Sequence, residues 1–160
     1  MDIQIRPALK RDAQSILNLI QELAVFEKEP NAVVVTKADI EDHGFGDQAL
    51  FQCLVAESQG QVVGMALFYP RYSTWKGPTY HLEDLIVTEA HKSKGIGTAL
   101  YKAFIAHAYD SGVNRIEWVV LDWNTPAVSF YKNSGAAVLE DWNTVQMDRE
   151  SMHNYLKDIK

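Results

Sequence analysis

The chain has 160 residues, of which 47% are hydrophobic and 22% charged, a composition that suits one domain with a core of its own. Its formal net charge of −6 argues against nonspecific nucleic-acid binding and is compatible with a cationic substrate. The single cysteine, Cys53, excludes an internal disulfide and a cysteine-rich metal site, and the five histidines lack ligand spacing, so we expect no metal. No apolar run could span a bilayer and the N-terminus lacks a signal-peptide pattern, so we expect a cytoplasmic protein without a membrane partner.

The N-terminal half predicts three strands and two helices. Ile3 and Ile5 alternate with polar neighbours and predict a short strand. Apolar residues at helical spacing predict a helix over residues 10–26, and Thr36 and Asp39 have the spacing of a capping box that opens a second, short helix. Strands are expected at residues 51–56, where Cys53 is a small core residue, and 62–69, joined by a turn at 57–61; residues 70–78 are expected to form a loop.

The C-terminal half continues this alternation. We expect a strand over residues 80–87, a helix that ends at Ser111-Gly112, a strand over 116–121, and a helix that Asn124 opens and Gly135 ends. Strands at 138–139 and 144–147 and a short or frayed helix over 150–160 would complete the chain. This order predicts one domain over residues 1–160 of the α/β class, with a mixed sheet and helices on both faces.

A glycine-rich turn is the first candidate site. The apolar run Leu85-Ile86-Val87 ends, and Lys92-Ser93-Lys94-Gly95-Ile96-Gly97-Thr98 crosses into a helix. Unpaired N–H groups at a helix N-terminus and its dipole favour an anion, and glycine lets phosphate oxygens approach the backbone. The turn therefore predicts a pyrophosphate site, although it matches neither the dinucleotide-binding fingerprint nor the Walker motif.

Glu83 and Asp84 are the second candidate, because they interrupt an apolar strand. Adjacent strand residues point to opposite faces, so at least one of these acids should face inward, where a carboxylate needs a partner or a task. The alternative is an edge strand with two solvated acids. We favour the functional interpretation because the same strand runs directly into the glycine turn.

Tyr131 is the third candidate. It lies in the helix that follows Trp123-Asn124-Thr125-Pro126, next to Phe130. A tyrosine hydroxyl can deliver a proton to a leaving group, but a capped helix with an aromatic core face would have the same residues. Spacing alone does not separate these two interpretations.

In this order, the glycine turn, the strand acids and the Asn-x-Pro helix resemble the GNAT superfamily of acetyl-CoA-dependent N-acetyltransferases over nearly the whole chain. The family motif Arg/Gln-x-x-Gly-x-Gly/Ala corresponds to residues 92–97, where Lys92 keeps the charge but loses the planar fork of arginine. Five further peptides resemble the diamine acetyltransferases, which include spermidine/spermine and thialysine enzymes: Glu22-Leu23-Ala24-Val25-Phe26-Glu27, Asp42-His43-Gly44-Phe45-Gly46, Cys53-Leu54-Val55-Ala56-Glu57, Leu82-Glu83-Asp84, and Trp123-Asn124-Thr125-Pro126 with Phe130-Tyr131-Lys132. Ser73 and Phe26 depart from the polyamine enzymes, which carry an acid and a tyrosine there.

The resemblance implies a twisted, mostly antiparallel mixed sheet and direct acetyl transfer in a ternary complex, without a metal. It implies that Glu83 is the general base, Tyr131 the general acid, and Asp84 and Glu27 the groups that hold a cationic acceptor. Phe26 and Trp75 would line the acceptor pocket, although Trp75 could equally be a loop aromatic packed on the core. The implied acetyl-CoA contacts are Leu85, Ile86 and Val87 along the pantetheine, Asn124 and Ala127 bordering the pantetheine, Tyr131 at the sulfur, and Lys92, Ser93, Lys94, Gly95, Ile96, Gly97 and Thr98 at the pyrophosphate.

The leading functional hypothesis is an N-acetyltransferase for a small primary amine, either a diamine or polyamine or a lysine-like amino acid such as thialysine. The alternatives are a protein or peptide N-acetyltransferase and a non-catalytic acetyl-CoA-binding module. The resemblance also implies a homodimer. We expect no nucleic-acid partner.

Overall fold

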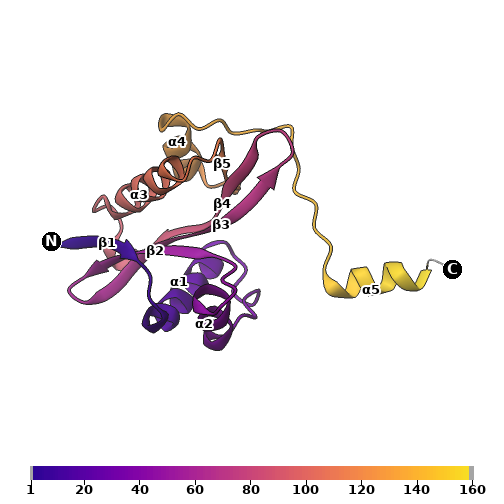
Figure 1. The fold of residues 1–160 in the computed structure, drawn as a ribbon, viewed down its shortest axis with the longest axis horizontal. Helices are drawn as coiled ribbons and strands as arrows, with labels where there is room; N and C mark the ends of the chain where they lie inside the picture. Colours follow the sequence, from indigo (N-terminus) through magenta and orange to yellow (C-terminus); the bar gives the residue numbers. More distant parts are fainter. Residues whose placement is uncertain (1, 159–160) are drawn as a thin grey trace. The chain divides into compact units, whose positions relative to one another are not determined.

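A computed structural model describes residues 2–158 (Figure 1). The chain divides into two compact units, one that ends at Val119 and one that begins at Val120, and each is described by itself. No helix within the described residues is both long and apolar enough to cross a membrane.

The first unit is built on a five-stranded sheet in the order β1-β2-β3-β4-β5. Neighbouring strands from β1 to β4 are antiparallel, and β5 runs parallel to β4. The sheet is therefore mixed and mostly antiparallel, as predicted. The strands are β1 Ile3–Pro7, β2 Gln52–Ser58, β3 Gln61–Ser73, β4 Gly77–Val87 and β5 Ile116–Glu117.

Helices cover both faces of this sheet, which confirms the predicted fold class (Figure 1). On one face lie α1 (Ala13–Phe26), which follows the short helix η1 (Lys10–Asp12), and α2 (Lys37–Phe45), with Cys53 buried in their core. On the other face lies α3 (Ile96–Asp110), packed over the core residues Phe68 and Leu82. The predicted capping box of α2 forms, because the Thr36 hydroxyl accepts a hydrogen bond from the Asp39 N–H at 3.2 Å.

The β3–β4 hairpin is longer than the sequence predicts. Residues 70–78 were expected to form a loop, but β3 continues to Ser73 and β4 begins at Gly77, and Pro70 pairs with Tyr80. Pairing between β2 and β3 stops at Gln52 and Phe68, and beyond Phe68 strand β3 pairs only with β4 among the described strands. Pro70 therefore lies where one edge of β3 has no partner strand, and proline is tolerated there. The hairpin reverses over residues 74–76, where the Ser73 hydroxyl accepts hydrogen bonds from the Trp75 and Lys76 N–H groups at 3.2 Å.

The second unit contains α4 (Thr125–Asn133) and α5 (Arg149–Asp158). The strands expected at 138–139 and 144–147 are wrong, since both segments are irregular. Their apolar side chains are largely exposed, 64% for Leu139 and 92% for Val145, so no buried face holds them in strand pairing. The strand expected at 116–121 is also shorter, at two residues, whereas the expected C-terminal helix forms; residues 159–160 lie outside the described part.

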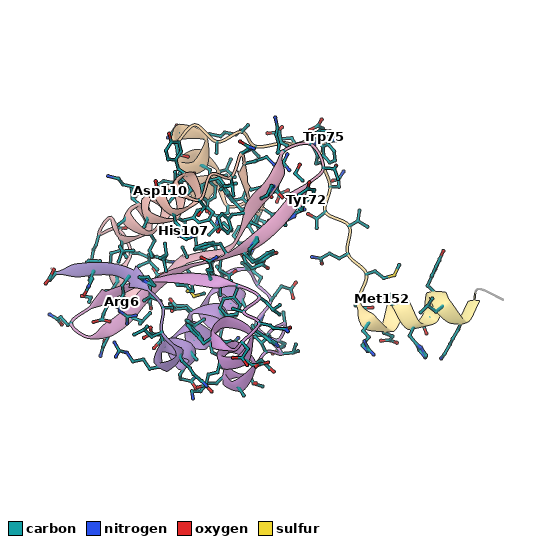
Figure 2. The ribbon with its side chains drawn as sticks, viewed as in Figure 1. Arg6, Tyr72, Trp75, His107, Asp110 and Met152 are labelled. Carbon is teal, nitrogen blue, oxygen red and sulfur yellow. The ribbon has the colours of Figure 1, made fainter. Side chains whose placement is uncertain are left out.

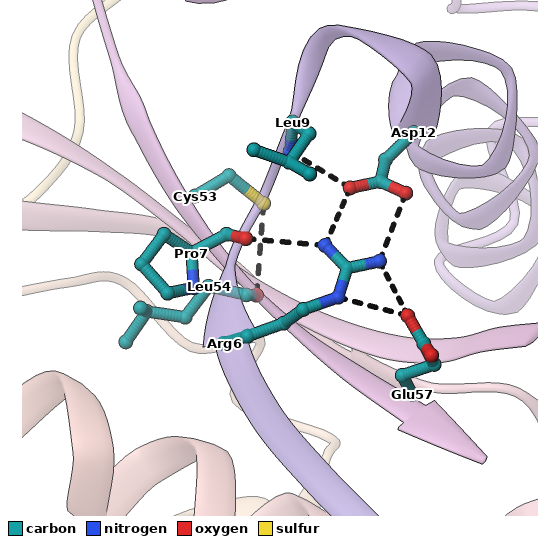
Figure 3. A network of polar contacts seen from close by, with 7 residues as sticks. All are labelled: Arg6, Pro7, Leu9, Asp12, Cys53, Leu54 and Glu57. Atoms are coloured by element: carbon teal, nitrogen blue, oxygen red, sulfur yellow. Dashed lines mark hydrogen bonds and ion pairs between the residues drawn. The ribbon is translucent and has the colours of Figure 1, made fainter. Parts of the chain in front are cut away.

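The Arg6 guanidinium ties the start of α1 to two strands (Figure 3). It donates two hydrogen bonds to Asp12, at 2.7 and 3.1 Å, and two to one oxygen of Glu57, at 2.8 and 2.6 Å. Asp12 is buried and also accepts from the Leu9 N–H at 2.8 Å. These hydrogen bonds hold the pKa of Asp12 below its usual value, with Arg6 the largest cause.

We expect Asp12→Asn to lower the free energy of unfolding by about 3 kcal/mol, because it leaves a largely buried guanidinium without one of its two carboxylates. Because the pKa of Asp12 is lower in the folded state, its carboxylate stabilises the fold at pH values above the ordinary pKa of 3.8. This contribution is lost as the pH falls through the folded-state pKa. The variant should therefore lose less stability in acid than the parent, as measured by urea unfolding between pH 7 and pH 2. Glu41→Gln, which breaks only a surface pair with Lys37, is the control, and an equal effect of both changes would contradict the account.

Candidate active site

A β-bulge at Glu83 organises the site. Leu82 pairs with Phe68 on β3, but Asp84 pairs with Leu67, the residue directly before Phe68. Glu83 is therefore an extra residue in β4 without a position of its own in the register. Such an insertion locally breaks the pairing and re-aims the side chains that follow it.

The bulge brings both acids to the face of the sheet covered by α1. Ile86, two residues after Asp84, packs in the core beneath α1. His81, two residues before Glu83, contacts Glu83 and lies against Tyr69 with ring centroids 5.2 Å apart. The expectation that the two acids point to opposite faces is therefore wrong, because alternation restarts at the bulge. The alternative of two solvated acids is also wrong: Glu83 is exposed, but Asp84 is half-buried.

Three carboxylates gather at this point. Glu27, directly after α1, lies close enough for the charge of Glu83 to raise its pKa, although partial burial is the larger cause. Burial raises the pKa of Asp84 to about 7, and the charges of Glu83 and Glu27 add to that shift. Like charges at a half-buried site favour the binding of a cation between them.

Tyr69 and His81 complete the surroundings of Glu83. The Tyr69 hydroxyl donates to Glu83 Oε2 at 2.9 Å, and His81 Nε2 lies 3.4 Å from the same oxygen. Burial, followed by the Glu83 contact, raises the pKa of Tyr69 to about 12, so this hydroxyl keeps its proton at neutral pH. Sequence reasoning missed both residues, although His81 is two positions before Glu83 and shares its face by simple alternation.

The C-terminal part of β4 has an open edge. Strand β5 pairs with β4 only at Tyr80 and His81. Leu85, Ile86 and Val87 pair with β3 alone among the described strands, so the opposite edge of their backbone is available to an extended ligand. Binding of pantetheine along Leu85, Ile86 and Val87 stays a prediction.

The glycine turn links this open edge to α3. Gly95 precedes the helix with φ of 78°, a left-handed conformation that favours glycine. Gly97 needs no special φ, and an added Cβ would come only to 3.7 Å from Val87. The described packing therefore leaves room for a side chain at position 97, and a role of Gly97 in close ligand approach stays a prediction. Ile96 is buried and anchors the turn to the core, while Thr98 and Ser93 are exposed.

Both lysines of the turn make local contacts. Lys92 Nζ lies 2.6 Å from a Glu89 oxygen and 5.2 Å from the centre of the Phe26 ring, and Lys94 Nζ donates to the Ala90 carbonyl at 3.0 Å. The end of α1 therefore lies near two parts of the site: Phe26 contacts Lys92 of the glycine turn, and Glu27 lies near Glu83.

Trp75 lies away from this cluster. It sits at the tip of the β3–β4 hairpin, near Tyr72, and is 80% exposed (Figure 2). The alternative that Trp75 is packed on the core is therefore wrong. Among the described residues, no hydrogen bond or ion pair joins Trp75 to Glu27, Glu83 or Asp84, and its place in an acceptor pocket stays a prediction.

In the second unit, α4 has the local structure that the sequence predicts. The Asn124 side chain accepts a hydrogen bond from the Ala127 N–H at 3.4 Å, Pro126 lies in the first turn, and Gly135 follows the helix with φ of 96°. Tyr131 is half-buried, with its ring in an edge contact with Phe130 at 5.5 Å.

Comparisons with known proteins agree with this arrangement. The model of the Acetyltransferase (GNAT) family matches residues 14–136. The thialysine N-epsilon-acetyltransferase of Mus musculus is 39% identical over 160 residues, covering 93% of this chain and 94% of the relative. The spermidine/spermine N(1)-acetyltransferase-like protein 1 of Homo sapiens is 36% identical over 159 residues, which are 93% of this chain but 23% of that protein.

Among solved structures, an integron cassette protein from V. cholerae has the same fold, with a TM-score of 0.80 at 20% identity over 98% of this chain and 99% of that one. The solved structure shows the fold alone. The family model and the sequence relatives also show the family, because the model matches residues 14–136 and the relatives are 36% and 39% identical over 93% of the chain. The chain therefore belongs to the GNAT family and is an N-acetyltransferase.

Proposed function

We propose that this protein transfers the acetyl group of acetyl-CoA directly to the primary amine of a small molecule, within a ternary complex. The observation that carries the proposal is the carboxylate cluster at the Glu83 bulge, on the same strand that leads into the glycine turn. The acceptor is a diamine, a polyamine or a lysine-like amino acid, as in the names of the sequence relatives. We further propose that the protein is a cytoplasmic homodimer.

The acidic cluster suits a cationic acceptor. An alkylamine with a pKa of about 10.4 is almost entirely protonated at neutral pH, so it must be held as a cation and then deprotonated. Asp84 and Glu27 hold the ammonium group, and Glu83 removes one proton, through a water molecule. The neutral nitrogen then attacks the thioester carbonyl, and the N–C bond forms as the carbonyl π electrons move to oxygen. The C–S bond breaks when this oxyanion collapses, and the second proton of the nitrogen passes to water, which returns the proton that Tyr131 gives to the thiolate.

The oxyanion, the pyrophosphate and the departing thiolate of acetyl-CoA also need partners. A backbone N–H of Leu85, Ile86 or Val87, beside the bulge, donates to the oxyanion, and the open strand edge pairs with the pantetheine. Residues 92–98 hold the pyrophosphate, with Asn124 and Ala127 beside the pantetheine. Tyr131 protonates the departing thiolate, so coenzyme A leaves as the thiol.

An acceptor panel tests the function. Spermidine, putrescine, lysine, thialysine and a basic peptide are each mixed with acetyl-CoA, and thiol release is measured. We expect release with at least one small amine, and loss of most of that activity in Glu83→Gln, by about 10²-fold. Glu29→Gln, an exposed acid near the end of α1, is the control. Release with the peptide alone would favour a protein acetyltransferase, and acetyl-CoA binding without any release would favour a binding module.

The pKa of Asp84 predicts how acceptor binding depends on pH. A pKa of about 7 makes this carboxylic acid neutral below and charged above that pH, and only the charged form attracts an ammonium group. The KM for the amine should therefore fall as the pH rises through 7, and this fall should vanish in Asp84→Asn but persist in Asp47→Asn. If the wild-type KM did not change between pH 6 and pH 8, Asp84 would not be an acceptor ligand.

The role of Tyr131 is tested at the leaving group. We expect Tyr131→Phe to lower kcat by about 10²–10⁴-fold, because the thiolate then departs without a positioned acid. Binding of acetyl-CoA, measured by calorimetry, should persist. Tyr109→Phe, an exposed tyrosine of α3, is the control. Unchanged turnover in Tyr131→Phe would remove this residue from the mechanism.

A further inference from the structure

His81 lies between a guanidinium group and the proposed base. The Arg71 Nη1 atom is 3.1 Å from His81 Nδ1, and His81 Nε2 is 3.4 Å from Glu83 Oε2. Arginine can only donate hydrogen bonds, so His81 Nδ1 must accept, and the single proton of a neutral imidazole then resides on Nε2. That proton lies on the ring nitrogen nearest to Glu83. The 3.4 Å separation is longer than an ordinary hydrogen bond, as catalytic contacts often are before substrates bind.

The surroundings of His81 keep the imidazole neutral. Burial lowers its pKa most, and the charge of Arg71 lowers it further, against the opposing effect of Glu83 and Glu117. The groups that face it are Arg71 and Tyr69 on β3, Glu83 on β4 and Glu117 on β5. A neutral imidazole can accept from Arg71 and donate to Glu83 at once, which an imidazolium cannot.

Two groups therefore contact one oxygen of the base. The Tyr69 hydroxyl donates a hydrogen bond to Glu83 Oε2, and His81 Nε2 lies 3.4 Å from the same atom, whereas within residues 2–158 the other oxygen, Oε1, receives no hydrogen bond. Oε1 is left as the oxygen that can take a proton. Because Glu83 is a bulge residue and half of its side chain is exposed, these contacts are what orient the carboxylate.

Arg71, on β3, is itself held by a residue of β5. Its Nη1 atom lies 2.8 Å from Glu117 Oε1, and Glu117 Oε2 lies 3.0 Å from Arg115 Nε. A continuous polar chain thus runs from β5 through Arg71 and His81 to Glu83. A purely structural role for this chain would be to hold the two-residue strand β5 against β4.

We propose that His81 is a positioning residue for Glu83: Arg71 holds it as the Nε2–H tautomer, and with Tyr69 it fixes the carboxylate so that Oε1 faces the acceptor. This inference rests on the proposed role of Glu83 as the base.

The test compares His81→Phe, which has no ring N–H, with His81→Gln, whose amide keeps one donor and one acceptor. In His81→Phe, we expect kcat to fall about 10-fold, since a contact that orients the carboxylate is lost. His81→Gln should restore most of kcat, and the KM for acetyl-CoA should stay the same throughout. An unchanged kcat in folded His81→Phe, even if its thermal stability falls, would overturn the proposal, as would a His81→Gln that behaves like His81→Phe.

Nitrogen NMR of the imidazole rings in the full-length protein tests the tautomer without any activity. We expect the His81 proton on Nε2 in the wild type, and a mixture of tautomers in Arg71→Met. A proton on Nδ1, or a doubly protonated ring at pH 7, would overturn the proposal. If the wild type acetylates no amine while the Nε2–H tautomer is observed, the proposed function fails rather than the geometry of His81.

Discussion

The extra residue in β4 is the constraint on which the rest of the site depends. Without the bulge, Glu83 and Asp84 would lie on opposite faces of the sheet, one of them in the apolar core beneath α3. With it, both acids lie beside Glu27, Tyr69 and His81 on the α1 face. The cost is a locally broken ladder, which the long β3–β4 pairing on both sides of the bulge offsets.

One short segment of the fold serves both substrates of the proposed reaction. Strand β4 has acids at the bulge and an open edge directly after it, and the chain then enters the glycine turn and α3. The end of α1 touches both regions, since Phe26 lies beneath the Lys92 ammonium group and the Glu22 carboxylate accepts the Glu89 N–H at 2.8 Å. A change in the glycine turn can therefore reach the carboxylate cluster through α1 as well as through β4.

Local signals predicted most of the elements, because their causes lie within a few residues of sequence. The capping box at Thr36, the glycine turn at Gly95 and the Asn124 cap all formed where expected. The bulge was not predictable in this way, because it depends on the register with β3, which lies some 15 residues earlier along the chain. The strands expected at 138–139 and 144–147 also depend on distant residues, because a short apolar segment becomes a strand only where a neighbouring strand and a core receive it. The role of Tyr131, in the second unit, remains a prediction from the family resemblance.

A crystal structure of the protein with coenzyme A and its best acceptor amine tests the central claim most directly. The account predicts that the reactive nitrogen lies within hydrogen-bonding distance of Asp84 or Glu27, that Glu83 Oε1 reaches it directly or through one water, and that the pantetheine runs along Leu85–Val87. An acceptor bound elsewhere, with Glu83 and Asp84 both in solvent, would contradict it.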